Sequence, residues 1–257
     1  MIKLIACDID GTLIRDDCPT LAPAVLEQVE RLLDKGVYFC PTSGRQYSSI
    51  RRLFAPLAGR LYCICENGGI LYGPGDPGEL LGRIAMERPE ALALCHDILA
   101  LEGYEALISG ADTSYICPKK AGYESLVRDF LGNNTVVVPT PEDIPEDIVK
   151  ITAYHPESAR PAMQPVAAWG EKLNMAIAGE LWLDFSPSHK GLGLSKLCGM
   201  LDVDLADVLA VGDSYNDLPM LDIVGHPYIM DSAAEELKQR FPDHCRRVED
   251  LLATIDG

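Results

Sequence analysis

The sequence predicts an α/β fold, in which a doubly wound, Rossmann-like core with a parallel sheet is interrupted by an inserted α+β domain. Three observations predict it. Short apolar runs alternate with segments of helical periodicity at both ends of the chain, as in folds with a parallel sheet. Two of these apolar runs end in acidic loops. Between residues 83 and 184 the pattern changes to short β-like runs and amphipathic helices, and this length is enough for a separate domain.

The first predicted strand covers residues 2–7 and runs into Asp8-Ile9-Asp10-Gly11-Thr12. Residues two apart in a strand point to the same side, so Asp8 and Asp10 are expected to share a side where the strand ends. The elements expected next are a Pro-containing loop (14–20), a helix (21–35), a strand (37–40), a helix (46–57), a strand (61–65), a hairpin turn at Asn67-Gly68-Gly69 and a turn-rich exit from the core (74–82).

The insert and the C-terminal part of the core are predicted from the same two periodicities. In the insert we expect helices at 89–101, 123–131 and 158–169 and strands at 106–109, 113–117, 135–138, 149–154 and 181–185. After it we expect helices at 192–201, 218–221, 233–240 and 248–255 and strands at 208–211 and 227–230. The core is therefore predicted at residues 1–82 and 185–257, and the inserted domain at 83–184.

Composition excludes several classes of partner. The net charge of −17 repels nucleic acid and anionic membranes, so neither is expected as a partner. The same field repels phosphate, so a phosphate site must supply local positive charge. The nine cysteines are scattered, and Cys63-Ile64-Cys65 lacks the spacing of a redox or zinc pair. Reduced thiols, together with the lack of a long apolar segment or leader, favour a cytoplasmic protein.

Polar side chains follow three of the predicted core strands. Asp8 follows the first strand, Ser43-Gly44-Arg45 the second, and the strand at 208–211 ends in Gly212-Asp213-Ser214-Tyr215-Asn216-Asp217. Ligands of doubly wound sheets bind at the carboxyl ends of the strands, so the Asp8 and Ser43 loops are expected at one mouth. Carboxylates that meet there repel each other unless a cation lies between them or one holds a proton. Ser43 is also compatible with a simple helix cap.

These three segments, with Lys190-Gly191, resemble the four signature motifs of the haloacid dehalogenase superfamily of phosphohydrolases. Their order and spacing are most similar to the Cof-type sugar-phosphatase branch. The resemblance covers the predicted core, and it implies that residues 83–184 form a mobile cap. The insert carries no motif of its own, so the sequence does not name a substrate.

The resemblance implies a role for each matching residue. Asp8 is the implied nucleophile and Asp10 the general acid–base. Mg²⁺ is the implied cofactor, held by the carboxylates of Asp8 and Asp213 and the backbone carbonyl of Asp10. Asp217 is either a further ligand or a helix N-terminal acid. The residues implied to bind phosphate or substrate are Thr12, Ser43, Gly44, Arg45, Lys190 and Asn216. Arg45 and Lys190 are also residue types that commonly lie exposed at a helix start.

We therefore expect a magnesium-dependent phosphomonoester hydrolase that acts on a small phosphorylated metabolite, with a sugar phosphate as the first expectation. Two alternatives stay open: a phosphomutase of the same superfamily and a non-catalytic protein that binds a phosphorylated metabolite. An intact general acid at Asp10 favours turnover, because a pure binder needs none. A monomer or weak homo-oligomer is expected.

Overall fold

The computed structural model describes residues 1–15, 20–178 and 180–255, so Cys18 and most of the expected 14–20 loop lie outside the described residues. The chain divides into two compact units: Met1–Gly82 with His189–Gly257, and Arg83–Ser188. The predicted fold class is confirmed, because the first unit holds a parallel sheet between helices and the second a mixed sheet with helices.

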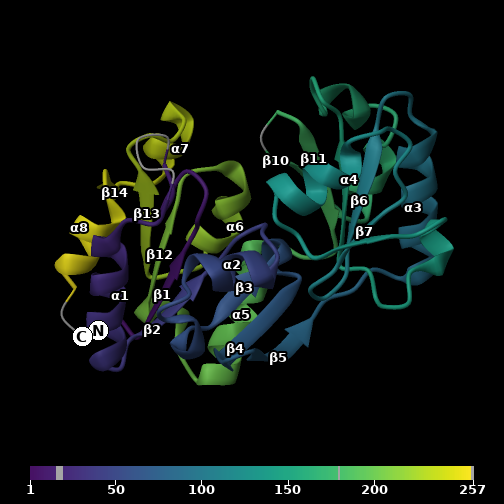
Figure 1. The fold of residues 1–257 in the computed structure, drawn as a ribbon. Coiled ribbons are helices and arrows are strands. Elements are labelled where there is room, and N and C mark those ends of the chain that lie inside the picture. Colours follow the sequence, from purple (N-terminus) through teal and green to yellow (C-terminus); the bar gives the residue numbers. More distant parts are fainter. Residues whose placement is uncertain (16–19, 179, 256–257) are drawn as a thin grey trace. The chain divides into compact units, whose positions relative to one another are not determined.

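A five-stranded parallel sheet in the order β14-β13-β12-β1-β2 forms the centre of the first unit (Figure 1). Its central strand β1 pairs with β12 on one side and β2 on the other, with Leu4 opposite both Val208 and Tyr38. The strands are β1 (Leu4–Cys7), β2 (Tyr38–Pro41), β12 (Val208–Gly212), β13 (His226–Met230) and β14 (His244–Cys245). Every residue of β1 and β12 is buried, as expected for strands covered on both faces.

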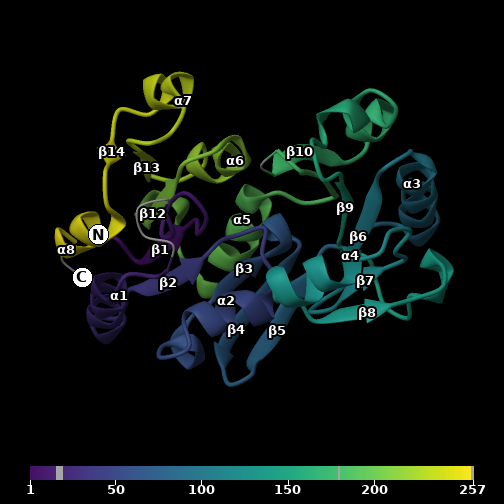
Figure 2. The same cartoon turned by 45° about the horizontal axis from the view of Figure 1, so that its top comes forward.

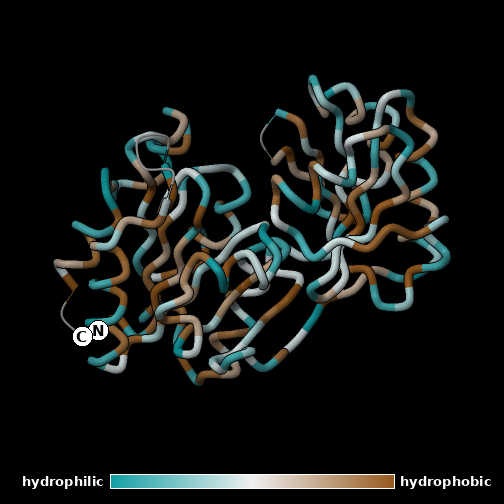
Figure 3. The backbone as a smooth tube through the Cα atoms, viewed as in Figure 1, coloured by the Kyte–Doolittle hydropathy of each residue, from teal (hydrophilic) through white to brown (hydrophobic). Residues whose placement is uncertain are grey.

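Helices cover both faces of this sheet. Leu4 and Ala6 pack on one face with Leu194 and Leu197 of α5, while α1 contacts β2 and α8. Figure 3 shows apolar residues concentrated along these strands. The helices of the unit are α1 (Pro23–Asp34), α2 (Tyr47–Leu53), α5 (Lys190–Leu201), α6 (Leu218–Leu221), α7 (Glu235–Arg240) and α8 (Val248–Ala253).

A smaller antiparallel sheet follows β2 in the same unit. It consists of β3 (Cys63–Cys65), β4 (Ile70–Gly75) and β5 (Gly78–Arg83), and Thr42 and Ile64 form a bridge that connects it with the end of β2. The predicted hairpin after β3 is present. The predicted exit at 74–82 contains a turn only at Asp76-Pro77. The residues on both sides of that turn belong to β4 and β5, and the first segment of the unit ends at Gly82.

The second unit is a six-stranded sheet in the order β10-β11-β9-β6-β7-β8, with α3 (Arg88–Ala100) packed against β6 and β9 (Figure 2). Tyr123 of the short helix α4 (Tyr123–Ser125) and Val127 of the following turn pack on Leu107 and Ile116. The strands are β6 (Glu105–Ser109), β7 (Ser114–Ile116), β8 (Thr135–Val137), β9 (Lys150–Tyr154), β10 (Asn174–Ala178) and β11 (Trp182–Ser186).

Three expectations for the insert differ from the structure. The helix expected at 158–169 is instead two short 3₁₀ turns, because Pro161 and Pro165 cannot donate the hydrogen bonds of a continuous helix. Strand β10 was not predicted, although it pairs with β11 along its whole length. The second unit continues to Ser188, past the expected end at Asp184, because the hydroxyl of Ser186 donates to the Val149 carbonyl and the Ser186 and Ser188 hydroxyls bond to each other. Within the described ranges, the structure contains no helix long and apolar enough to cross a membrane.

Candidate active site

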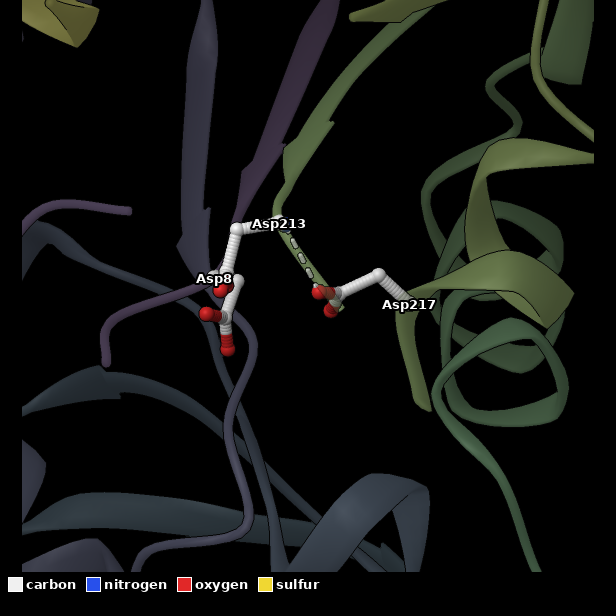
Figure 4. A group of neighbouring side chains, drawn as sticks. All are labelled: Asp8, Asp213 and Asp217. Atoms are coloured by element: carbon white, nitrogen blue, oxygen red, sulfur yellow. Dashed lines mark hydrogen bonds between the residues drawn. The ribbon is translucent and has the colours of Figure 1, made fainter. Parts of the chain in front are cut away.

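The site lies where the central strands β1 and β12 end. The amide of Asp8 donates to the Val211 carbonyl at 3.0 Å, so the first residue after β1 stays in register with β12. Asp213 follows β12 directly. Figure 4 shows the carboxylates of Asp8, Asp213 and Asp217 turned toward one another. One oxygen of each lies within 4.8 Å of the others, so two strand ends and the loop after β12 build one acidic group.

A buried lysine faces this group. Lys190 Nζ donates to Asp8 Oδ1 at 2.5 Å and to Asp217 Oδ1 at 2.6 Å. Lys190 is 1% exposed, Asp8 5% and Asp217 0%, so the three charges are shielded from water. One ammonium therefore stands against three carboxylates, and the described group carries surplus negative charge.

Local structure explains why Lys190 is in this place. It is the first residue of α5, and the preceding His189 caps the helix by accepting the Leu192 amide at its Nδ1. This bond makes His189 a structural residue of the helix start. A side chain at position 191 would overlap the backbone carbonyl of Pro219, so Gly191 lets the first turn of α5 pack closely on α6.

Asp217 connects Lys190 with the loop after β12. Its Oδ2 accepts the amides of Asp213 and Ser214, both at 3.0 Å, while its Oδ1 accepts Lys190. It also forms a capping box with Ser214 at the short turn Tyr215–Asp217. Asp217 therefore caps the N-terminus of a short helical turn and also belongs to the acidic group.

The electrostatics follow from burial and like charge. Burial raises the pKa of Asp8 well above its ordinary value, an effect that Lys190 opposes and Asp217 reinforces. Burial, then the charge of Asp217, raise the pKa of Asp213 to about 6. Burial alone would lower the pKa of Lys190, but Asp217 and Asp8 raise it above its ordinary value, so the ammonium stays charged. Without a bound metal ion, the carboxylates of Asp8, Asp213 and Asp217 therefore repel one another, and only the ammonium of Lys190 opposes this repulsion.

The loop after β1 fits tightly against Asp213. Gly11 has φ of +90°, and a Cβ there would lie 2.3 Å from Asp213 Oδ2, so only glycine is accommodated. The buried Thr12 donates its hydroxyl to Asp213 Oδ1 at 3.2 Å. Of the residues that the sequence singled out, Asp8, Thr12, Lys190, Asp213 and Asp217 are thus linked by direct contacts or by membership of the acidic group.

Asp10 and Arg45 form a second pair. Arg45 Nε donates to Asp10 Oδ2 at 2.8 Å and Arg45 Nη2 to Asp10 Oδ1 at 2.5 Å, which is the two-pronged geometry that guanidinium and carboxylate favour. The amide of Arg45 donates to the buried Ser43 hydroxyl at 3.2 Å. The carboxylate of Asp10 is therefore turned toward Arg45 and lies outside the acidic group.

Gly44 and Asn216 both lie against Asn67, a residue that was predicted only as part of a hairpin turn. Asn216 Nδ2 donates to Asn67 Oδ1 at 3.4 Å, and a Cβ at Gly44 would lie 3.2 Å from the same oxygen. No local pattern identified Asn67, because its contacts come from loops that are distant in the sequence.

The acidic group fits a small divalent cation. Mg²⁺ prefers hard oxygen ligands from one or two carboxylates. Asp8 and Asp213 supply such oxygens, and the single ammonium of Lys190 faces three carboxylates, so the group has room for further positive charge. The donor set contains carboxylates only, which does not match the thiolate or imidazole sites typical of zinc.

Comparison with known proteins agrees with this arrangement. A family model described as haloacid dehalogenase-like hydrolase matches residues 5–250. The chain is similar to an HMP-PP phosphatase of Yersinia enterocolitica, at 26% identity over 94% of this chain and 88% of the relative. It is also similar to the 5-amino-6-(5-phospho-D-ribitylamino)uracil phosphatase YitU of Bacillus subtilis, at 27% identity over 92% and 89%.

A solved structure from Eubacterium rectale superposes with a TM-score of 0.87 at 30% identity, covering 98% of each chain. The fold therefore matches over both units, and the resemblance to the family stated from the sequence is confirmed.

Proposed function

The chain belongs to the haloacid dehalogenase-like hydrolases and is a phosphatase of that family; we propose that it hydrolyses a small phosphorylated metabolite through an aspartyl-phosphate on Asp8, with Mg²⁺ bound. The observation that carries the proposal is the buried Asp8 carboxylate at the end of β1, held by Lys190 at 2.5 Å beside Asp213. A nucleophile, a fixed cation and a set of cation ligands are the parts that phosphoryl transfer needs.

In the first half-reaction a carboxylate oxygen of Asp8 attacks phosphorus as the bond from phosphorus to the leaving oxygen breaks. Asp10 gives its proton to that leaving oxygen. In the second half-reaction Asp10 takes a proton from water, the water oxygen attacks the phosphorus of the aspartyl-phosphate, and orthophosphate leaves. Asp8 is then a free carboxylate again and Asp10 is protonated, so the cycle closes.

Mg²⁺ would be held by Asp8, Asp213 and the backbone carbonyl of Asp10, with Asp217 adding to the negative charge around it. When bound, the ion would supply positive charge to the phosphate oxygens. Lys190 stays charged beside Asp8 and supplies a second, fixed positive charge to the same oxygens. The Ser43 hydroxyl and the Gly44 amide are the proposed donors to the phosphate, while the Thr12 hydroxyl, which donates to Asp213 at 3.2 Å, holds that carboxylate in place.

Arg45 was expected to bind phosphate or substrate, and we propose a further role for it beside Asp10. Its guanidinium binds Asp10 through two hydrogen bonds, which supports a role in orienting the acid–base in addition to any contact with substrate.

We propose a sugar phosphate as the substrate class and residues 83–188 as a cap that selects the leaving group. The relatives that carry substrate names act on other small phosphorylated metabolites, HMP-PP and a phosphorylated ribitylaminouracil, which supports the size class. We place the protein in the cytoplasm, as the reduced thiols suggested.

The test is a phosphate-release screen with Mg²⁺ over sugar phosphates, nucleotides, pyridoxal phosphate, flavin mononucleotide and the two named compounds. We expect orthophosphate from at least one small ester, without a bisphosphate activator and without isomerised product. Isomerisation that requires the activator would favour a phosphomutase. Binding of esters with no product of either kind would favour a non-catalytic protein.

A further inference from the structure

A buried turn outside the four motif segments contacts three of them. Glu66, Asn67 and Gly68 follow β3 directly and have φ of 51°, 55° and 97°. The left-handed region is unfavourable for residues other than glycine, and Glu66 and Asn67 are both buried. The surrounding contacts must therefore hold this turn in place, and such strain in a native fold points to a function.

The turn fixes the backbone of the Ser43-Gly44-Arg45 loop. The amide of Asn67 donates to the Ser43 carbonyl at 3.0 Å, and the amide of Glu66 donates to the Arg45 carbonyl at 3.1 Å. Both ends of the loop are thus bound to two successive amides of the turn.

The side chain of Asn67 extends the connection to the loop after β12. Its Oδ1 accepts Asn216 Nδ2 at 3.4 Å. A Cβ at Gly44 would lie 3.2 Å from that Oδ1 and 3.3 Å from Nδ2, so the amide plane lies directly against Gly44. One amide group therefore lies between the Ser43 loop and the residue next to Asp217.

The same turn also packs against the start of α5. A Cβ at Gly68 would lie 2.2 Å from the His189 carbonyl, and a Cβ at Gly193 would lie 2.8 Å from Gly68 Cα. The turn is therefore in close backbone contact with the helix end that carries Lys190.

We propose that Asn67 is a positioning residue: its amide group and backbone N–H hold the Ser43 loop and the Asn216 loop in one fixed relation around the phosphate site. Its effect on turnover rests on the proposed function, because the two loops carry proposed phosphate-binding residues. A misplacement of about 1 Å in such a site can cost about 100-fold in rate.

The test variant is Asn67→Gly, which keeps the left-handed backbone and removes only the side chain. Its matched control is Asp202→Gly, a residue with φ of 54° at the exposed C-terminal cap of α5. Both changes place glycine where positive φ is required, so they relieve the backbone equally. Gly44→Ala is a second variant, which presses on the Asn67 amide and leaves the turn unchanged.

We expect kcat of Asn67→Gly to fall by about 100-fold with KM changed by less than about threefold. Asp202→Gly should stay within about twofold of wild type in both. The double variant Asn67→Gly with Asn216→Ala should lose less activity than the sum of the two single losses, because each change removes the same contact. Near-wild-type kcat in Asn67→Gly, or full additivity with Asn216→Ala, would overturn the proposal.

Hydrogen exchange in the absence of substrate separates this proposal from the phosphatase itself. Amides of residues 43–46 and 213–217 should exchange faster in Asn67→Gly and in Gly44→Ala, and should not change in Asp202→Gly. Unchanged exchange in both segments for the two site variants would overturn the proposal even if wild type is an active phosphatase. A wild type that releases no phosphate would end the proposed function and leave this readout intact.

Discussion

Each of the two units buries a lysine beside an aspartate, but the balance of charge differs between them. In the first unit, Lys190 faces Asp8 and Asp217 at 2.5 and 2.6 Å, and Asp213 adds a third carboxylate. In the second unit, Lys150 lies 3.6 Å from Asp184. The other oxygen of Asp184 accepts the Thr152 hydroxyl at 2.6 Å.

The comparison teaches which buried charges point to chemistry. A buried ion pair by itself is weak evidence, because desolvation can cancel its attraction. In the first unit, three carboxylates share one ammonium in a buried place. Burial, reinforced by the charge of Asp217, raises the pKa of Asp8 and of Asp213, and this combination marks a candidate site. Among the described residues, no comparable group of three carboxylates surrounds the Lys150–Asp184 pair of the second unit.

The sharpest way to separate the two regions is to neutralise one aspartate in each. Asp8→Asn removes the proposed nucleophile and should lower kcat by about 10⁴-fold or more, as in other enzymes that lose a covalent nucleophile. Asp184→Asn makes the same change at the other buried pair and should keep turnover within about tenfold of wild type. Phosphate release and circular dichroism measure activity and fold. A tenth or more of wild-type activity in Asp8→Asn would rule out the aspartyl-phosphate.

Replacing the lysines tests the charge surplus itself. Without metal, Lys190→Met should destabilise the first unit by roughly 3–5 kcal/mol, because buried carboxylates lose their cation. Lys150→Met should cost less, roughly 1–3 kcal/mol, since Asp184 keeps the hydroxyl of Thr152. Denaturant unfolding with chelator present measures both. Mg²⁺ should restore part of the stability of Lys190→Met and none of that of Lys150→Met; equal responses would contradict the comparison.

Magnesium should stabilise the first unit alone. A ligand held only by the folded state adds about 2.7 kcal/mol at 100 times its dissociation constant. For a chain of this size that is a rise in Tm of about 5–10 °C. Asp213→Asn should shrink the rise, while Asp184→Asn should leave it unchanged. Thermal melts with Mg²⁺ and with chelator decide this, and an identical rise in wild type and Asp213→Asn would mean that Asp213 is not a ligand.

The smallest expected effect is the pH dependence of the rise in Tm that Mg²⁺ causes. The pKa of Asp213 is raised from 3.8 to about 6. Its contribution to stability without metal is therefore complete below about pH 4 and is lost as the pH rises through about 6. Mg²⁺ binds the ionised form, so its binding should be about tenfold weaker at pH 5 than at pH 7, or about 1.4 kcal/mol.

Melts at pH 5 and pH 7, each with Mg²⁺ and with chelator, measure this dependence. The rise in Tm should be larger at pH 7. In Asp213→Asn the melting temperature without metal should vary less with pH over this interval. A rise that is the same at both pH values in wild type would contradict the raised pKa.

Strands β1, β2 and β12 of the core could be predicted because they are short apolar runs followed by motif residues, whereas β5 and β14 were not predicted as strands. Asp8, Asp213 and Lys190 were identified from the resemblance of their segments to the family's motifs, and the fold brings them together. The pairing of Asp10 with Arg45 could not be predicted, because it depends on how far the loop after β1 turns.

Other features were beyond local patterns as well. Asn67 was treated as a turn residue, since its contacts come from segments distant in the sequence. Strand β10 was missed because its residues 174–178 are only partly buried and lack alternation. In the insert, Pro161 and Pro165 interrupt a helical pattern that the surrounding apolar residues favoured.

The central position of β1 also constrains how the chain is made. Leu4 pairs with Val208, so the neighbour on one side of β1 is synthesised about 200 residues after it. At roughly 5–20 residues per second, a ribosome leaves this strand with one unpaired edge for about 10–40 s while the whole insert emerges. Nascent chains halted before residue 208 should therefore show a protease-sensitive N-terminal segment beside a protected insert, and protection of both at that length would show that β1 finds another neighbour first.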